Sequence, residues 1–364
     1  MLDVVTEALG RALPVAAFLL AISAVAELSD RAGVFDVAGH AMARLGRHRM
    51  WLLWLSFSAL AVACTVFLSL DTTAVLLPSV GLTIARQVGA APRAFALTTL
   101  WVANPGSLLL PVSNLTNLLA LPRLEQMGVD HGGYVRLAAA PALVAVVLTL
   151  ALVALLHRRE LSARYVVDPP AATHDHVLLR VAGATCLVIG PAFALGAAPW
   201  LVAGLAALVL AGVTAVRAPG TVRTLRLPWA MTVGFSLLMV AVTGAHRAGL
   251  LDPLVDLAGR GTGAGDLLQV AGVSALTANA VNNLPGYLAL EPAAQGEPAR
   301  LLAVLVGANA GPLVTPWASL ATLLWLDRCR AAGVTWRPWR LAAGGLLCVV
   351  VVVPATTLAL ALTT

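Results

Sequence analysis

Long apolar stretches alternate with short polar connections along the whole chain. Eight of these stretches approach or exceed the roughly 20 residues that a helix needs to cross a lipid bilayer. We expect full crossings at about residues 12–28, 93–121, 131–157, 177–195, 199–216, 228–246, 300–326 and 339–363. The pattern therefore predicts an all-α integral membrane protein with about eight full transmembrane helices.

Two further apolar segments carry polar residues in the middle and a proline shortly after them. The segment at about 50–88 has a polar tip at 69–73 followed by Pro78, and the segment at about 264–291 has one at 277–283 followed by Pro285. Polar residues in hydrocarbon are costly unless they face a cavity or one another. We therefore predict two re-entrant helical hairpins, each entering and leaving on one side of the membrane.

An internal repeat relates the two halves of the chain. Residues 103–119 align with residues 308–324 at a constant offset of 205, and 8 of the 17 positions are identical. Asn104 matches Asn309, and Pro111 matches Pro316. Upstream of each copy lies a related motif, RAGVFD or RAGLLD. This self-similarity indicates two copies of one structural unit.

The arginines predict how the two copies are oriented. All 23 lysine-plus-arginine positions are arginine, and the trace above puts 17 of them on one side of the membrane and 6 on the other. The positive-inside rule makes the richer side cytoplasmic and both termini extracytoplasmic. The first hairpin then enters from the cytoplasm and the second from outside. The repeats are therefore predicted to be inverted, as in many secondary transporters.

These features divide the chain into two repeats and a linker. The N-terminal repeat is predicted at 1–157, with its hairpin at 50–88 and a broken helix at 93–121. A cytoplasmic linker follows at 158–176. The C-terminal repeat is predicted at 177–364, with its hairpin at 264–291 and a broken helix at 300–326. Only the second repeat has two crossings before its RAG motif, and the sequence leaves open whether the shorter first repeat is a fragment or a natural short form.

The composition supports a membrane protein and excludes a soluble globular protein. Hydrophobic residues make up 60% of the chain and charged residues 11%, against about 25% charged in an ordinary globular domain. The net charge of +6 reports membrane topology and not nucleic-acid binding. The first apolar stretch is expected to be a transmembrane helix, not a signal peptide. We therefore place the protein in the cell membrane as a multi-pass protein.

The two broken helices carry the densest polar runs. Pro105, Gly106 and Pro111 interrupt helical hydrogen bonding in the run 104–117, so the helix must unwind there. The run 309–322 repeats the arrangement with Gly311 and Pro316. Freed carbonyls and side chains in such breaks bind small solutes or cations. The alternative is that these Ser and Asn side chains only hold helices together. The candidate binding residues are Ser113, Asn114, Asn117, Thr315, Ser319 and Thr322.

Asp71 is the only carboxylate in the four polar runs. Desolvation disfavours the charged form of a carboxylate, so Asp71 is predicted to take up and release a proton during transport. The alternative is that it caps the second arm of the hairpin, and the two roles are compatible. No arginine or histidine lies in these runs, which favours a neutral solute or a small cation over a multivalent anion.

No enzyme, metal centre or cofactor is predicted. An intramembrane hydrolase needs a Ser/His pair, paired acids or an H-E-x-x-H motif inside the bilayer, and the sequence offers none. The four cysteines stand far apart, without the spacing of a zinc site or a disulfide framework.

The polar runs resemble the arsenite/antimonite exporter family of the ion-transporter superfamily. TANAVNNLPGYLAL resembles the family's second hairpin, NAGPLVTPWASLATLLWL its second unwound helix, and LDTTAVLLP and SLLLPVSNLTNLL the matching parts of the first half. The resemblance implies that Asp71, Thr72 and Thr73 line the first hairpin tip and that Asn279, Asn282 and Asn283 line the second. It also implies that Ser113, Asn114 and Asn117 line the first break and Thr315, Ser319 and Thr322 the second.

The function implied by the resemblance is export of arsenite or antimonite as the neutral hydroxide in exchange for protons, by alternating access. Three hydroxyls without net charge suit a site of Asn and Thr side chains. The alternative is a sodium/proton antiporter or an anion/sodium symporter of the same superfamily. The sequence leaves open whether the protein forms a homodimer and whether a soluble ATPase docks on the arginine-rich cytoplasmic face.

Overall fold

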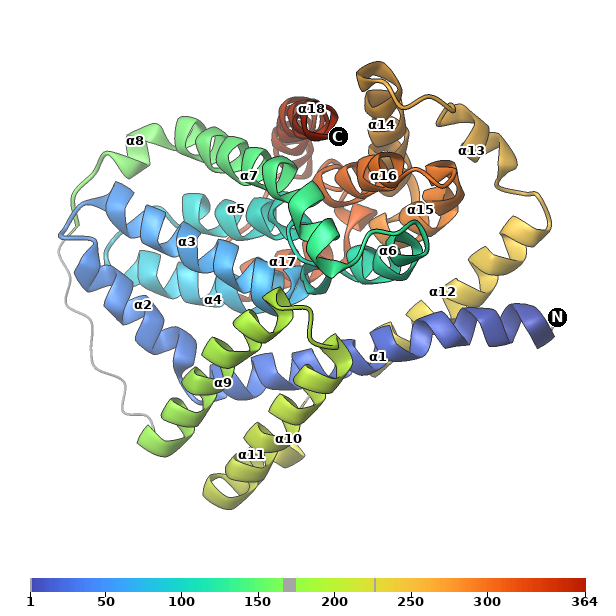
Figure 1. Ribbon diagram of the computed structural model, residues 1–364. Coiled ribbons are helices and arrows are strands. Elements are labelled where there is room, and N and C mark those ends of the chain that lie inside the picture. The colour runs from blue at the N-terminus through green and yellow to red at the C-terminus, as the bar shows by residue number, and fades with distance from the viewer. Residues whose placement is uncertain (1, 166–174, 226) are drawn as a thin grey trace.

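A computed structural model describes residues 2–165, 175–225 and 227–364 (Figure 1). The described residues form helices, and their only extended pairing is an isolated bridge between Arg49 and Arg164. The predicted linker at 158–176 lies partly outside the described residues. The part of it that is described contains a short helix, α8 (Arg158–Leu161).

Six unbroken helices correspond to six of the predicted crossings. They are α1 (Leu2–Arg31), α7 (His131–Leu156), α9 (His176–Ala194), α10 (Pro199–Arg217), α12 (Trp229–Arg247) and α18 (Pro338–Thr363). The other two crossings are interrupted, as predicted: α5 (Pro92–Ala103) leads to α6 (Leu115–Gln126), and α16 (Pro298–Ala310) leads to α17 (Leu320–Ala331). Short helices α2 (Val34–Leu45), α11 (Pro219–Arg223) and α13 (Asp252–Leu257) connect them.

Each predicted hairpin is a pair of helices that turn at a single residue. Helix α3 (Met50–Leu68) is itself long and apolar enough to cross a membrane, but the chain reverses at Ser69 into α4 (Leu70–Gln87). Helix α14 (Ala264–Val281) reverses at Asn282 into α15 (Asn283–Leu290), which continues into η3 (Glu291–Ala294). Ser69 has a φ of 92° and Asn282 a φ of 136°. Such strained backbone in a non-glycine residue persists only where the surroundings hold it, and it often marks a functional site.

The helices form two groups. The peripheral group includes α1, α10 and α12, and the core group contains the two hairpins and the two broken helices. In Figure 1, α1 runs across the lower half of the view with α9 and α10 extending below it, and it packs against α10 and α12. The two hairpins and the two broken helices lie on the other side. Every residue from 94 to 103 of α5 and from 300 to 310 of α16 is buried, because hairpin arms, α7 and α18 surround these half-helices.

The two halves of the chain are interleaved in the core group. Helix α4 of the first hairpin packs against α17, which belongs to the second broken helix. Helices α14 and α15 of the second hairpin pack against α16, and α15 also contacts α6 of the first broken helix. Each hairpin is therefore covered partly by a half-helix from the other half of the chain.

Close backbone approach holds the second broken helix against the second hairpin and against α18. A Cβ atom added at Gly307 of α16 would overlap the carbonyl oxygen of Ala271 in α14. One added at Gly345 of α18 would overlap the carbonyl oxygen of Leu313 in the second break. Only glycine permits these contacts, which is how helices in membranes pack closely without a large apolar driving force.

Candidate functional site

The first break unwinds around its two prolines into two short 3₁₀ turns, η1 (Pro105–Leu108) and η2 (Pro111–Ser113). Asn117 at the start of α6 donates from Nδ2 to the carbonyls of Ser107 (2.7 Å) and Leu110 (3.1 Å). Ser113 donates to the carbonyl of Val66 in the first hairpin at 2.9 Å. These bonds satisfy backbone oxygens that the break leaves without helical partners.

The second break, around η4 (Pro316–Ala318), is held by hydrogen bonds to the second hairpin. Asn279 of α14 donates from Nδ2 to the carbonyl of Gly311 (2.7 Å) and accepts from the backbone N–H groups of Val314 (3.0 Å) and Thr315 (3.1 Å). Asn282 donates to the carbonyl of Trp317 at 2.8 Å. The amides of Asn279 and Asn282 are therefore engaged in holding the break in shape.

The two broken helices meet at Asn309. Its Oδ1 atom accepts hydrogen bonds from Asn114 Nδ2 and Thr116 Oγ1, both at 2.9 Å. Its Nδ2 atom donates to Asn117 Oδ1 at 2.8 Å. All four side chains are buried. The end of α16 and the first turn of α6 are thus joined by a closed network of amides and one hydroxyl, which we call the Asn309 junction.

The residues related to this junction by the internal repeat make no such network. The offset of 205 relates Asn309 to Asn104, Asn114 to Ser319, and Asn117 to Thr322. Asn104 Oδ1, Ser319 Oγ and Thr322 Oγ1 are buried, and none has a hydrogen-bond partner within the described part of the chain. Buried polar atoms without partners are rare in native proteins and call for an explanation such as a bound solute, ion or water.

A cavity of about 260 Å³ lies where both hairpin tips and both breaks converge. Its polar lining comes from Asp71, Asn114, Asn282, Asn283 and Ser319. Helix α12 supplies an apolar wall, and leucines fill the remainder of the lining. The apolar lining residues are Met231, Phe235, Leu238, Leu70, Leu115, Leu284 and Leu320.

Asp71 and Asn283 face this cavity with uncommitted side chains. Neither side chain has a hydrogen bond or an ion pair to another described residue, and Asp71 is half-buried. Ser69, not Asp71, caps α4, because its Oγ accepts from the backbone N–H of Thr72 at 3.5 Å. The carboxylate is therefore available for a proton or a solute. Among the residues that line the cavity there is no arginine or histidine.

The structure separates the candidate residues into two groups. Asp71, Asn114, Asn282, Asn283 and Ser319 are brought together around the cavity. The others are buried beside it or hold the backbone: Thr72 and Thr73 bond the carbonyls of Leu68 and Ser69, and Thr315 bonds the carbonyl of Asn279. Ser113, Asn117, Asn279 and Thr322 likewise do not line the cavity.

Sequence reasoning missed the α12 wall of the cavity. Met231, Phe235 and Leu238 recur at helical spacing, but this signal is the same for a lipid-facing stripe as for a cavity wall. It also missed the junction role of Asn309, although the repeat had singled that residue out.

Comparisons with known proteins agree with this architecture. A family model described as citrate transporter matches residues 2–324. An arsenical pump membrane protein from Yersinia enterocolitica is 30% identical and one from Escherichia coli 28% identical, and each alignment covers 85% of this chain and 77% of the relative. The crystal structure of the YdaH transporter of Alcanivorax borkumensis, described as having an unusual topology, superposes with a TM-score of 0.61 at 18% identity. That superposition covers 98% of this chain and 87% of the other, and it supports the fold alone.

The family match and the apolar helices identify a membrane transporter with several crossings. The matched relatives are aligned over more than two thirds of their own length, so the relationship extends well beyond a single motif. The chain therefore belongs to the arsenical pump membrane protein family.

Proposed function

We propose that this transporter exports arsenite or antimonite as the neutral trihydroxide, in exchange for protons. The observation that carries the proposal is the composition of the cavity between the hairpin tips: neutral hydrogen-bonding groups, one uncommitted carboxylate, an apolar wall and no cationic side chain in its lining. The names of the relatives agree with arsenic as the substrate.

The charge of the cavity disfavours the multivalent anion that the family model's description suggests. A citrate-like solute would place its carboxylates beside Asp71 with no arginine, lysine or histidine in the lining to balance them. Like charges in a low-dielectric cavity repel strongly, and carboxylates are normally recognised by arginine. A neutral trihydroxide meets no such penalty, and its hydroxyls match Asn283, Ser319 and Asp71.

Asp71 provides the proton-coupling step of the proposal. Protonated, the carboxyl group donates a hydrogen bond and adds no charge to the cavity. Ionised, it accepts bonds from the hydroxyls of the solute. Alternating access then exchanges the proton and the solute across the membrane, because each favours a different charge state of the same side chain.

A sodium-coupled mechanism is the second candidate, and a separate observation favours it. Asn104 Oδ1, Ser319 Oγ and Thr322 Oγ1 are three buried oxygens without partners in the described residues. Oxygen atoms of this kind are the ligands that hard cations prefer. A sodium/proton antiporter or an anion/sodium symporter would use them as the cation site.

One flux experiment distinguishes these candidates. Arsenite accumulation is measured in everted membrane vesicles from cells that lack their own exporter, with a proton gradient, a sodium gradient or neither. Accumulation driven by the proton gradient alone supports the proposal. Sodium-driven recovery of a pH gradient with no response to arsenite supports the second candidate. If correctly inserted protein shows neither activity, both candidate functions are contradicted.

A further inference from the structure

We propose that the solute reaches the outside along α12 and that the ion pair between Arg123 and Glu291 is the gate that closes this route. The inference rests on the proposed function for the identity of the solute, but not for the gate itself. Two cavities near the ends of α6 and α15 carry the argument, and both lie on the side that the arginine distribution assigns to the exterior.

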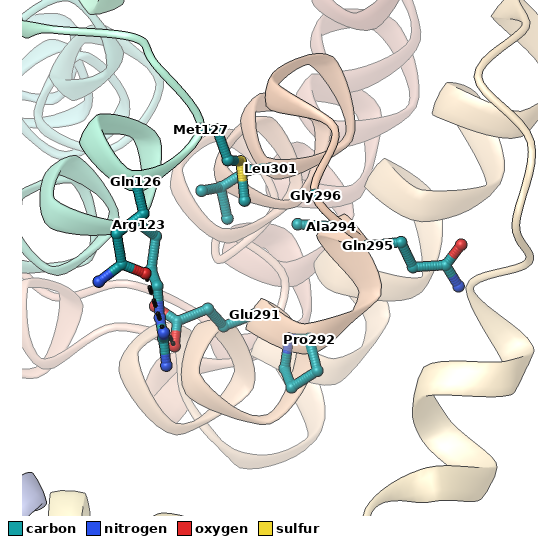
Figure 2. Close-up of a pocket in the computed structure, with 9 residues that line it drawn as sticks. All are labelled: Arg123, Gln126, Met127, Glu291, Pro292, Ala294, Gln295, Gly296 and Leu301. Atoms are coloured by element: carbon teal, nitrogen blue, oxygen red, sulfur yellow. Dashed lines mark hydrogen bonds and ion pairs between the residues drawn. The ribbon is translucent and has the colours of Figure 1, made fainter.

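The two cavities share part of their lining. The larger, about 400 Å³, is lined by the end of α6, by η3 with the loop that follows, and by Leu301 (Figure 2). The smaller, about 140 Å³, lies against α12. Both are lined by Arg123, Glu291 and Pro292. Figure 2 shows Arg123 of α6 reaching toward Glu291 at the edge of the larger cavity.

The smaller cavity continues the line of the central cavity along one face of α12. Met231, Phe235 and Leu238 line the central cavity. Met239, Val242, Thr243 and His246 line the smaller one. Positions 231, 235, 238, 242 and 246 are three or four residues apart, and 239 and 243 directly follow two of them, so all seven follow one broad stripe on the helix. The stripe therefore leads from the proposed binding site to the gate.

Glu291 is clamped by three different elements. Arg11 of α1 donates from both terminal nitrogens, at 2.9 Å and 2.5 Å, and Arg123 of α6 donates from Nε at 3.4 Å. The buried hydroxyl of Tyr287, one turn earlier in α15, donates at 2.8 Å. The Glu291 side chain is 9% exposed and that of Arg123 is 38% exposed. Arg11 makes two short hydrogen bonds to Glu291, whereas Arg123 makes one longer bond and its side chain is partly exposed to solvent. The Arg123 contact is therefore the weaker one.

This clamp also controls the position of the site. Helix α15 has eight residues, with Asn282 and Asn283 of the cavity at one end and Glu291 at the other. His246 of α12 donates from Nε2 to the carbonyl of Leu288 in the same short helix at 2.9 Å. Opening the gate by moving α15 would thus shift the binding residues together with the gate. Separate movement of Arg123 opens the route and leaves the site in place.

The test measures access and needs no substrate. A reporter cysteine is placed in the smaller cavity by Thr243→Cys and, separately, in the central cavity by Leu238→Cys. The half-buried Cys186 is replaced by serine, and the other native cysteines are buried. The protein is held in lipid nanodiscs, so that a charged, water-soluble thiol reagent reaches both faces. Arg123→Gln, which keeps the Arg11–Glu291 pair, is compared with Arg136→Gln, the same change at an exposed position of α7 outside both cavities.

Arg123→Gln is expected to raise the labelling rate of both reporters about threefold, the size of effect that a partly exposed ion pair supports, while Arg136→Gln leaves both rates unchanged. Glu291→Asp, which shortens the acid but keeps its charge, should raise the rates in the same direction. Unchanged labelling in both gate variants, or an equal rise in the Arg136→Gln control, overturns the gate. A response of the Thr243→Cys reporter alone shows a closed side pocket and overturns the route.

The gate and the proposed function fail independently in this design. If labelling responds as expected but reconstituted protein moves no arsenite, the gate stands and the substrate assignment is wrong. If arsenite moves but labelling does not respond, the substrate stands and the gate is wrong.

Discussion

The Nδ2 atom of Asn114 lies 2.9 Å from the Oδ1 atom of Asn309, 195 residues away in sequence, and joins the two broken helices in the centre of the molecule. The corresponding positions in the other copy, Ser319 and Asn104, each have a buried oxygen atom without a partner in the described residues. One junction is thus closed by its own hydrogen bonds and the other is left open. The two related positions in the repeat therefore differ in their hydrogen bonding.

Asn309→Ala should lower the free energy of unfolding by about 2–4 kcal/mol, because it removes bonds to three buried partners. Asn114 Nδ2 and Thr116 Oγ1 keep only longer bonds, at 3.2 Å and 3.5 Å. Asn104→Ala is the matched control in the other copy. It removes only a bond to the carbonyl of Leu100 at 3.1 Å and should cost about 1 kcal/mol or less. Thermal unfolding in detergent measures both. Equal losses would show that the two junctions are equivalent.

Asp71→Asn should abolish accumulation driven by a proton gradient but keep downhill arsenite exchange, because the amide keeps the size of the side chain and cannot exchange a proton at neutral pH. The pH dependence of transport should flatten in the same variant. Asp256→Asn, the same change at an exposed acid, controls for the substitution. Full proton-driven accumulation by Asp71→Asn at matched expression would place the proton on another residue.

Asn283→Ala should weaken downhill exchange and driven accumulation together, because it removes a group that faces the cavity and has no other partner among the described residues. A loss of one hydrogen bond to the solute corresponds to about a tenfold increase in the half-saturating concentration. Concentration dependence of arsenite flux measures this. An unchanged value would remove Asn283 from the binding site.

Thr322→Val tests the open junction, since valine has nearly the shape of threonine but no hydroxyl. If the hydroxyl binds a solute or an ion, stability should stay the same or rise slightly, while transport falls about tenfold. Thermal unfolding and flux are measured on the same preparation. Unchanged flux with raised stability would mean that the hydroxyl serves no ligand.

The carboxyl group of Asp175, which caps the N-terminus of α9, is expected to make the stability of the protein depend on pH. The backbone N–H of Leu178 and the guanidinium of Arg217 hold the pKa of this carboxyl below its ordinary value of 3.8. A lowered pKa contributes stability that is present above pH 3.8 and is lost as the pH falls through the lower folded-state value. The melting temperature of the natural protein should therefore exceed that of Asp175→Ala at about pH 6, and the gap should shrink below pH 3.8. A gap that does not change with pH would assign the effect to helix propensity.

The sequence was sufficient for the helices, the two turns and the two breaks, because bilayer length, helix-breaking prolines and polar interruptions are local properties. The paired helices span Met50–Gln87 around the turn at Ser69 and Ala264–Leu290 around the turn at Asn282. It was not sufficient to tell which polar side chains face a cavity. Asn279 and Asn283 stand four residues apart in one polar tip, yet the first holds the backbone of another segment and the second faces open space. That difference depends on where the second break lies in space.

The interleaving of the two halves has a consequence for the origin of this architecture. A single repeat standing alone would leave its hairpin partly uncovered, because α17 covers the first hairpin and α6 contacts the second. Such a unit would be complete only as an intertwined pair of identical chains that exchange half-helices. When the two units are joined in one chain, their sequences no longer have to be identical, so each unit can diverge from the other. Thr116 bonds Asn309, whereas its counterpart Ala321 has no side-chain group to bond, so only one of the two junctions is closed by side-chain hydrogen bonds among the described residues.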